Sequence, residues 1–289
     1  MRRALCALLC ALLLAFGCAS AGAEVYFDRL PREDWYRCPL FRLTAFDTDQ
    51  SDCLLLECGG EAMMVDGGTA DFCEELRDAL RGMGVTRFRC LLNTHYHEDH
   101  IGGLRELMRY GFAAGAYLTP YGDFASRVNE LQKQTLEQAE LSGVPVFQVA
   151  SGDTLLLGEA VLTILRYDEG LSTNGRSLIV HARFGDATLL LTADIIGDTQ
   201  TWCVQHLPAS LLDVDVLKAP HHGITAMVPA FWQAASPQAL LITNTPSRAR
   251  DTQAQADRAG VPALFSGVGR VVMETDGDDW YIYQQKGSF

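Results

Sequence analysis

Short apolar runs alternate with polar, periodic segments along most of the chain. From Phe41 the runs FRLTAF, CLLLEC and AMMVDGG follow one another like strands of a meander, and the amphipathic segment 70–81 after them has the period of a helix. The apolar run FRCLLN predicts a buried strand, followed by a helix after Gly103, a strand near Ala116 and a long polar helix over 123–141.

The second half of the chain repeats this rhythm. Further strands are predicted in the runs DTLLLG, AVLTILRY, SLIVHARF, ATLLLTAD, VDVLKAP, ALLITNT, RVVMETD and WYIYQQ. Helices are expected over 198–206, 226–235 and 252–259. Because strands and helices mix throughout, with no Pro- or Ser-rich linker, the pattern predicts a single layered α/β domain over residues 24–289.

The first 23 residues have a different character. Two arginines precede an apolar run over residues 4–16, and small residues follow it, which is the layout of a secretory signal. The run is too short to span a membrane well, and no later run is long and apolar enough to do so. We therefore predict an exported protein, secreted or in the cell envelope, either cleaved after Ala23 or lipid-anchored at Cys18.

Composition adds information on the core, the charge and the cysteines. The chain has 289 residues, 48% of them hydrophobic, which is enough for a full core. Its formal net charge is -13, and loss of the signal brings it to -15, because two of 23 basic residues go and all 36 acidic residues stay. An extended surface that coats nucleic acid is thereby excluded, whereas a small molecule or a short anionic ester remains a compatible substrate. Pairing of the six cysteines outside the signal stays open.

Potential metal ligands are concentrated in the segment HYHEDH, residues 95–100, shortly after the run FRCLLN. His95 and His97 are two residues apart, so an extended backbone points both imidazoles to one side, while Asp99 and His100 face a second position nearby. Imidazole nitrogen and carboxylate oxygen in this proportion suit zinc, and also iron or manganese. The cluster predicts a metal site rather than a solvated polar loop.

Two later strand ends carry similar side chains. Asp194 ends the apolar run ATLLLTAD, where a carboxylate belongs at the mouth of a site, with a helix N-cap as the alternative. His221 and His222 follow the run VDVLKAP. Strand ends that carry acid or His side chains converge at one edge of a sheet, so these residues are predicted to complete the ligand set.

Two further residues have two interpretations each. Asp66, in the segment VDGG, either orients a ligand His from behind or only forms a turn with the glycines after it. Lys218 either binds a substrate phosphate or is a strand-end lysine that extends to solvent.

These motifs, in this order, resemble the metallo-β-lactamase superfamily, and within it the hydrolase domain of ComEC-type DNA-uptake proteins and their free-standing relatives. The resemblance covers nearly the whole chain after the signal and implies a four-layer αββα sandwich with metals at one edge. It departs from the family in two places. Segment 172–174 reads Ser-Thr-Asn where many members have a further His, and segment 244–248 lacks the Tyr-x-His-Pro element of ComEC-type relatives.

The resemblance also implies roles for the residues. His95 and His97 would hold the first metal and Asp99 and His100 the second, and Asp194 would bridge them. One of His221 and His222 would complete the second metal, with the choice left open. The first metal is then underligated, or is completed by Asn174 or water.

The expected activity is that of an exported metal-dependent hydrolase, with two zinc ions, or iron or manganese. A metal-activated bridging hydroxide would attack a phosphodiester or phosphate ester, with Asp99 orienting it and accepting its proton. Two alternatives remain: a β-lactam, lactone or thioester hydrolase of the same fold, and a binding module that retains metal without turnover.

Overall fold

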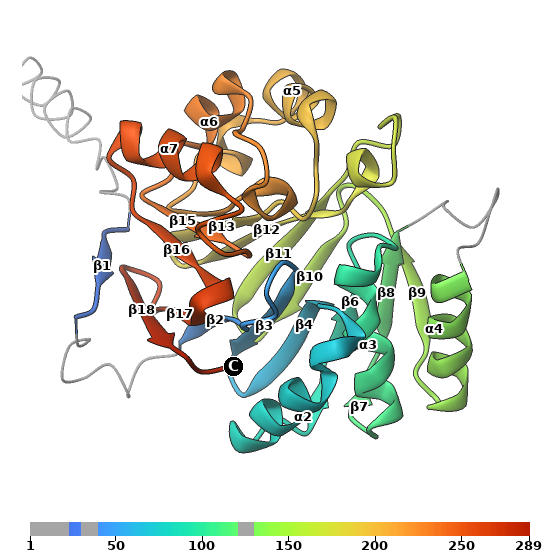
Figure 1. Cartoon of the computed structure of the whole chain (residues 1–289). Coiled ribbons are helices and arrows are strands. Elements are labelled where there is room, and N and C mark those ends of the chain that lie inside the picture. The colour runs from blue at the N-terminus through green and yellow to red at the C-terminus, as the bar shows by residue number, and fades with distance from the viewer. Residues whose placement is uncertain (1–22, 30–39, 121–129) are drawn as a thin grey trace, which may run out of the picture.

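The computed structural model describes residues 23–29, 40–120 and 130–289 (Figure 1). Nearly all of the predicted signal, including Cys18, and the start of the predicted 123–141 helix lie outside these residues. Within them, every helix is too short or too polar to cross a bilayer. The five cysteines of these segments are buried free thiols: Cys53, Cys58, Cys73, Cys90 and Cys203.

The larger of two main sheets has nine strands among the described residues. In spatial order these are β1 (Val25–Phe27), β18 (Trp280–Lys286), β17 (Gly269–Thr275), β2 (Phe41–Ala45), β3 (Cys53–Cys58), β4 (Glu61–Gly67), β6 (Cys90–Leu92), β8 (Tyr117–Pro120) and β9 (Val146–Val149). The strands from β18 to β4 are antiparallel, as the predicted meander requires, and those from β4 to β9 are parallel. The sequence pattern misses β1 and β9.

The smaller sheet has seven strands in chain order: β10 (Thr154–Leu157), β11 (Ala160–Leu165), β12 (Ile179–Phe184), β13 (Ala187–Leu191), β14 (Val216–Lys218), β15 (Ala239–Ile242) and β16 (Ala263–Phe265). The pairs from β10 to β13 are antiparallel and those from β13 to β16 are parallel. A separate small pair joins β5 (Arg87–Phe88) to β7 (Ala113–Ala114).

The two sheets pack face to face, and their shared core contains Leu56 and Met273 of one sheet and Leu189 and Leu241 of the other. The outer face of the larger sheet is covered by α2 (Cys73–Gly82), α3 (Glu98–Arg109) and α4 (Glu130–Leu141). The smaller sheet is covered by α5 (Gly197–His206), α6 (Pro229–Ala235) and α7 (Arg250–Ala259). Figure 1 shows these helix groups on opposite sides of the paired sheets, which confirms the predicted four-layer αββα sandwich.

Five 3-10 turns complete the described secondary structure: η2 (Ala70–Phe72), η3 (Asn174–Arg176), η4 (Ala209–Leu211), η5 (Pro220–Gly223) and η6 (Ser266–Val268).

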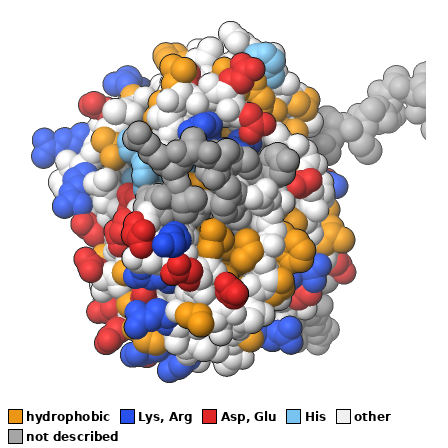
Figure 2. All heavy atoms as spheres, turned by 90° about the vertical axis from the view of Figure 1, so that its right-hand side faces the viewer, with side chains coloured by type: hydrophobic (Ala, Val, Ile, Leu, Met, Phe, Trp, Pro, Cys, Tyr) orange, Lys and Arg blue, Asp and Glu red, His pale blue; other side chains and the backbone are white. Residues whose placement is uncertain are grey.

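At the open edge formed by β9, Phe147 is half exposed. This side faces the viewer in Figure 2, where acidic and basic side chains are interspersed with apolar ones.

The helix predicted after Gly103 begins five residues earlier, at Glu98, so the end of the HYHEDH segment is helical. Two acidic residues in its first turn, Glu98 and Asp99, favour this start through the helix dipole. The second turn of α3 lies directly on the end of β4, because a Cβ at Gly103 would overlap the carbonyl oxygen of Gly67. Glycine at this position therefore permits the contact that brings α3 against β4.

Strand direction explains why distant residues meet. The parallel strands β4 and β6 end before Thr94, and the parallel strands β13 and β14 end before Asp194 and His221. Because parallel strands present their carboxyl ends at the same edge of a sheet, the polar residues after them gather along one edge of the sandwich.

Candidate metal centre

The gathered side chains form two groups that share one carboxylate. The first contains His95, His97 and Asp194, and the second contains Asp52, His100, Asp194 and His222. Within each group, one potential ligand atom per residue lies within 4.8 Å of all the others. This Asp/His cluster has the form of a dinuclear metal site.

Each oxygen of Asp194 faces a different pair of imidazoles. Oδ1 lies 3.2 Å from Nε2 of His100 and 3.4 Å from Nε2 of His222. Oδ2 lies 3.8 Å from Nε2 of His95 and 3.7 Å from Nε2 of His221. Asp194 is almost fully buried, so its carboxylate is fixed between the two pairs.

The second group has the unpaired atoms that a cation needs. Nε2 of His100, Nε2 of His222 and Oδ1 of Asp194 are buried and make no hydrogen bond of acceptable geometry. Buried polar atoms in proteins nearly always have a partner, so three that converge without one indicate a ligand position. Nitrogen and oxygen donors in this arrangement fit a divalent transition metal.

Asp66 lies directly behind His100. Its Oδ2 is 2.7 Å from Nδ1 of His100, and its two oxygens accept hydrogen bonds from the backbone N–H and the hydroxyl of Thr94. When Nδ1–H of His100 donates to this carboxylate, the Nε2 lone pair points toward Asp194 and is free for a metal. Asp66 also has a φ of 54°, which belongs to the turn into Gly67.

We expect Asp66→Asn to weaken metal binding about 10- to 100-fold, the usual effect of losing such a carboxylate. The amide would donate to Nδ1 of His100 and leave the proton on Nε2, which blocks the ligand atom. Isothermal titration with Zn²⁺ measures the change.

Asp215→Asn is the matched control, because Asp215 is also buried and accepts hydrogen bonds from the backbone and hydroxyl of Thr188. Equal affinity losses in both variants would contradict the role of Asp66.

Asp52 is a site residue that sequence analysis misses. Its Oδ1 accepts a hydrogen bond from the Thr243 hydroxyl at 2.6 Å and lies 3.2 Å from Nδ1 of His222. Asp52 thus lies behind His222 as Asp66 lies behind His100. The only sequence signal is an acidic residue just before the apolar strand CLLLEC, which is common in ordinary loops.

Lys218 is fully buried beside Asp52. Its ammonium is 2.6 Å from Oδ2 of Asp52 and donates to the carbonyl oxygen of Ala193 at 2.9 Å. Neither interpretation from the sequence describes this position, since the side chain neither extends to solvent nor presents a free ammonium to a substrate. Lys218 instead neutralises Asp52 and links β14 to the residue before Asp194.

The electrostatics of the site favour positive charge. Burial would raise the pKa of Asp194, but His100 and His222 hold it well below its usual value. Burial would lower the pKa of His222, but Asp194 and Asp52 raise it to about 10. His95 behaves differently: burial and the nearby His100 lower its pKa well below the usual value, which keeps its imidazole neutral and suited to metal binding.

The site has a buried side and an open side. His100 and His222 are fully buried, whereas His97 is exposed and the side chains of Asp99 and His221 are about a third exposed, at 30% and 34%. Oδ2 of Asp99 lies 3.3 Å from Nε2 of His222. A substrate can therefore approach from the side of His97, Asp99 and His221.

Asn174 lies at the same open side, at the start of η3. Its Nδ2 is 3.4 Å from Nε2 of His221, and its Oδ1 is buried without a hydrogen-bond partner. The structure thus brings every residue predicted for the site to this one edge.

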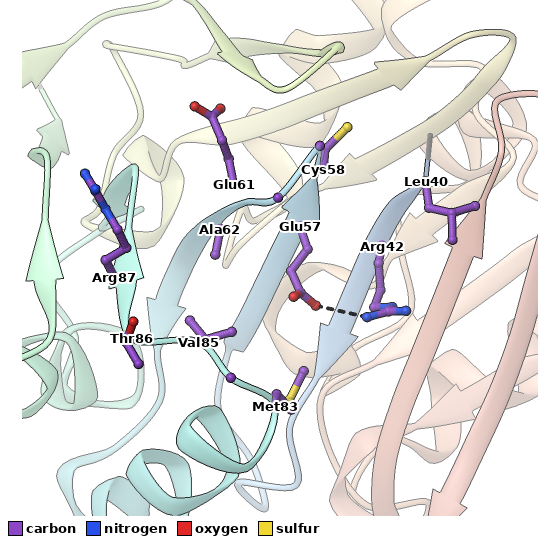
Figure 3. Close-up of a pocket in the computed structure, with 13 residues that line it drawn as sticks. Leu40, Arg42, Glu57, Cys58, Glu61, Ala62, Met83, Val85, Thr86 and Arg87 are labelled. Carbon is purple, nitrogen blue, oxygen red and sulfur yellow. Dashed lines mark ion pairs between the residues drawn. The ribbon is translucent and has the colours of Figure 1, made fainter. Parts of the chain in front are cut away.

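A hollow with a volume of about 580 Å³ lies away from this cluster, as Figure 3 shows. It is at the opposite end of β3 and β4, where Gly59 and Gly60 connect the two strands. Its charged lining includes Arg42, which pairs with Glu57 at 3.5 Å. The side-chain cluster, and not this hollow, therefore locates the candidate site.

Comparison with known proteins identifies the family. Residues 46–228 match the family model described as "Metallo-beta-lactamase superfamily". ComE operon protein 3 of Bacillus subtilis (strain 168) is 26% identical over 167 residues, which cover 57% of this chain and 21% of that protein. Atrochrysone carboxyl ACP thioesterase of Passalora fulva is 35% identical over 66 residues, which cover 22% of this chain and 20% of that protein. The chain thus spans about a fifth of the length of these curated relatives.

Solved structures share the fold at low sequence identity. The metallo-beta-lactamase fold protein YhfI from Bacillus subtilis has a TM-score of 0.55 and 15% identity, and the likeness covers 82% of this chain and 100% of that one. CmlA, a diiron beta-hydroxylase from Streptomyces venezuelae, has a TM-score of 0.54 and 15% identity, with 86% and 55% covered. With a family match over more than half of its length, the chain belongs to the metallo-beta-lactamase superfamily.

Proposed function

We propose that the chain is an exported hydrolase of phosphodiesters or phosphate esters that depends on two metal ions. The observation that carries the proposal is the position of Asp194, whose oxygens are shared between two groups of potential ligands. His95 and His97 would hold the first ion with Asp194, and Asp99, His100 and His222 would hold the second with Asp194. The donor set suits zinc, iron or manganese.

Two divalent ions, when bound, would lower the pKa of a water molecule between them to about 7, and they would polarise an oxygen of the ester. The chain's own residues supply the orientation. Asp194 fixes the two positions relative to each other, and Asp66 and Asp52 hold the rings of His100 and His222 from behind. Asp99 presents a partly exposed carboxylate at the open side, where it can orient a water molecule and accept its proton.

The choice of a phosphate ester rests on two supports. The motifs of this chain resemble those of ComEC-type hydrolase domains. The match to ComE operon protein 3 covers more than half of this chain. A site that holds two cations would also complement the negative charge of a phosphodiester, although the chain itself is acidic. Proposed substrates are therefore small or short anionic esters.

A second candidate is hydrolysis of a thioester, lactone or β-lactam at the same site. The match to a thioesterase over 66 residues favours the thioester among these. Hydrolysis of a thioester, lactone or β-lactam requires the same activated water and a polarised carbonyl oxygen. The metal centre alone therefore does not distinguish these reactions from phosphodiester hydrolysis.

The test uses purified chain loaded with Zn²⁺, Mn²⁺ or Fe²⁺ and three chromogenic reactions: a phosphodiester, a thioester and a β-lactam. We expect turnover of bis(4-nitrophenyl) phosphate that a chelator removes and added metal restores. Turnover of the thioester or the β-lactam without turnover of the phosphodiester would transfer the assignment to the second candidate. Tight metal binding with no turnover of any substrate would contradict both and indicate a metal-retaining binding module.

A further inference from the structure

The two adjacent histidines His221 and His222 face different groups of the site. Nε2 of His222 approaches Oδ1 of Asp194, the oxygen that also faces His100. Nε2 of His221 approaches Oδ2, the oxygen that also faces His95. The two imidazoles therefore lie on opposite sides of the same carboxylate, with their ring centres 6.1 Å apart.

An unusual backbone produces this separation. His221 and His222 both have left-handed conformations, with φ and ψ of 50° and 49° and of 52° and 20°. Residues other than glycine rarely adopt this region, and it costs about 1 kcal/mol or more for each residue. Such strain persists where surrounding contacts impose it, and here it turns consecutive side chains to the two sides of Asp194.

Hydrogen bonds on both sides hold the strained pair in place. The backbone N–H of His221 donates to the carbonyl oxygen of Ala193, the residue before Asp194, at 2.9 Å. The side-chain amide of Asn244 donates to the carbonyl oxygen of His222 at 3.2 Å. His221 is thus positioned directly from the loop that carries Asp194.

The first group otherwise has fewer potential ligands than the second. His95, His97 and Asp194 supply three. The second group has four, Asp52, His100, Asp194 and His222, and the carboxylate of Asp99 lies 3.3 Å from Nε2 of His222. A tetrahedral site needs a fourth donor, either from the protein or from water. Nε2 of His221 is 3.7 Å from the oxygen of Asp194 that faces this group.

We infer that His221 is a protein ligand of the first metal position, while its neighbour His222 serves the second. The inference rests on the proposed two-metal site and adds to it which histidine belongs to which ion. Asn174, 3.4 Å from Nε2 of His221, would limit the movement of that ring at the open side.

The test compares His221→Ala with His222→Ala, with His206→Ala as a control because His206 is an exposed histidine on α5. Each protein is titrated with Co²⁺, followed by its visible absorption, and with Zn²⁺ by calorimetry. We expect His221→Ala to weaken one of two binding steps by at least about 100-fold and to leave the other unchanged. His222→Ala should weaken the other step, with a different change in the Co²⁺ spectrum.

Double variants identify the position affected. His221→Ala combined with His95→Ala should weaken the same single step, whereas His221→Ala combined with His100→Ala should weaken both. Wild-type affinity for both ions in His221→Ala, or loss of the same step as in His222→Ala, would overturn the assignment. If the wild-type chain binds no Co²⁺ or Zn²⁺, the two-metal site and the assignment both fail. If both ions bind without phosphodiester turnover, only the proposed reaction fails.

Discussion

Replacement of Asp194 by Asn should remove metal from both positions at once. The amide keeps the shape of the side chain but loses the negative charge, and one of its two ends becomes a donor that points at imidazole nitrogens. Because each oxygen of Asp194 faces a separate pair of histidines, a single substitution affects both groups. Loss of an orienting partner costs roughly 10- to 100-fold in metal affinity, so we expect at least about 100-fold for this shared ligand.

The measurement is metal content after dialysis against a weak chelator, together with hydrolysis of the phosphodiester. Asp213→Asn is the matched control, because Asp213 is an exposed carboxylate just before β14. A variant that lost one ion and kept the other at wild-type affinity would show that Asp194 serves only one position. Thermal unfolding of both variants distinguishes loss of ligand from loss of fold.

Replacement of Asp99 by Asn should reduce turnover more than it reduces metal content. Asp99 is the partly exposed carboxylate of the site, and its neighbours Asp194, His100 and His222 remain to hold the second ion. Loss of a group that accepts a proton in the reaction typically costs about 10²- to 10⁴-fold in rate. We expect kcat to fall within this range when the assay is saturated with metal.

Metal titrations run beside the kinetics decide how Asp99 acts. If added metal restores the rate of Asp99→Asn to the wild-type value, Asp99 is only a ligand and does not handle the proton. If the rate is unchanged without added metal, Asp99 has neither role. The Asp213→Asn variant again controls for removal of one negative charge.

The site residues could be predicted where acidic residues or histidines follow an apolar run. The HYHEDH segment, Asp194 and the His pair each follow an apolar run, and parallel strands must end at one edge of a sheet, so their convergence could be predicted. The strand β9 could not, because three of its four residues are exposed and no apolar alternation marks it. The three-residue strands β1 and β16 were missed as well, whereas the equally short β6 and β14 were predicted because they lie in the apolar runs FRCLLN and VDVLKAP.

Contacts between distant segments were harder to predict. Asp52 meets Lys218 and Thr243 only because β3 and the β14–β15 edge face each other across the sandwich, and nothing local in the sequence indicates this. The different directions of His221 and His222 depend on two left-handed residues, which the sequence does not mark with glycine. The start of α3 at Glu98 depends likewise on its contact with the end of β4.

Anomalous diffraction from crystals grown with Zn²⁺ or Mn²⁺ would show directly whether Asp194 lies between two metal ions. We expect two peaks, one beside Oδ1 of Asp194 near His100 and His222, and one beside Oδ2 near His95 and His97. Peaks at other surfaces only, or no peak beside Asp194 at saturating metal, would contradict a dinuclear centre at this site.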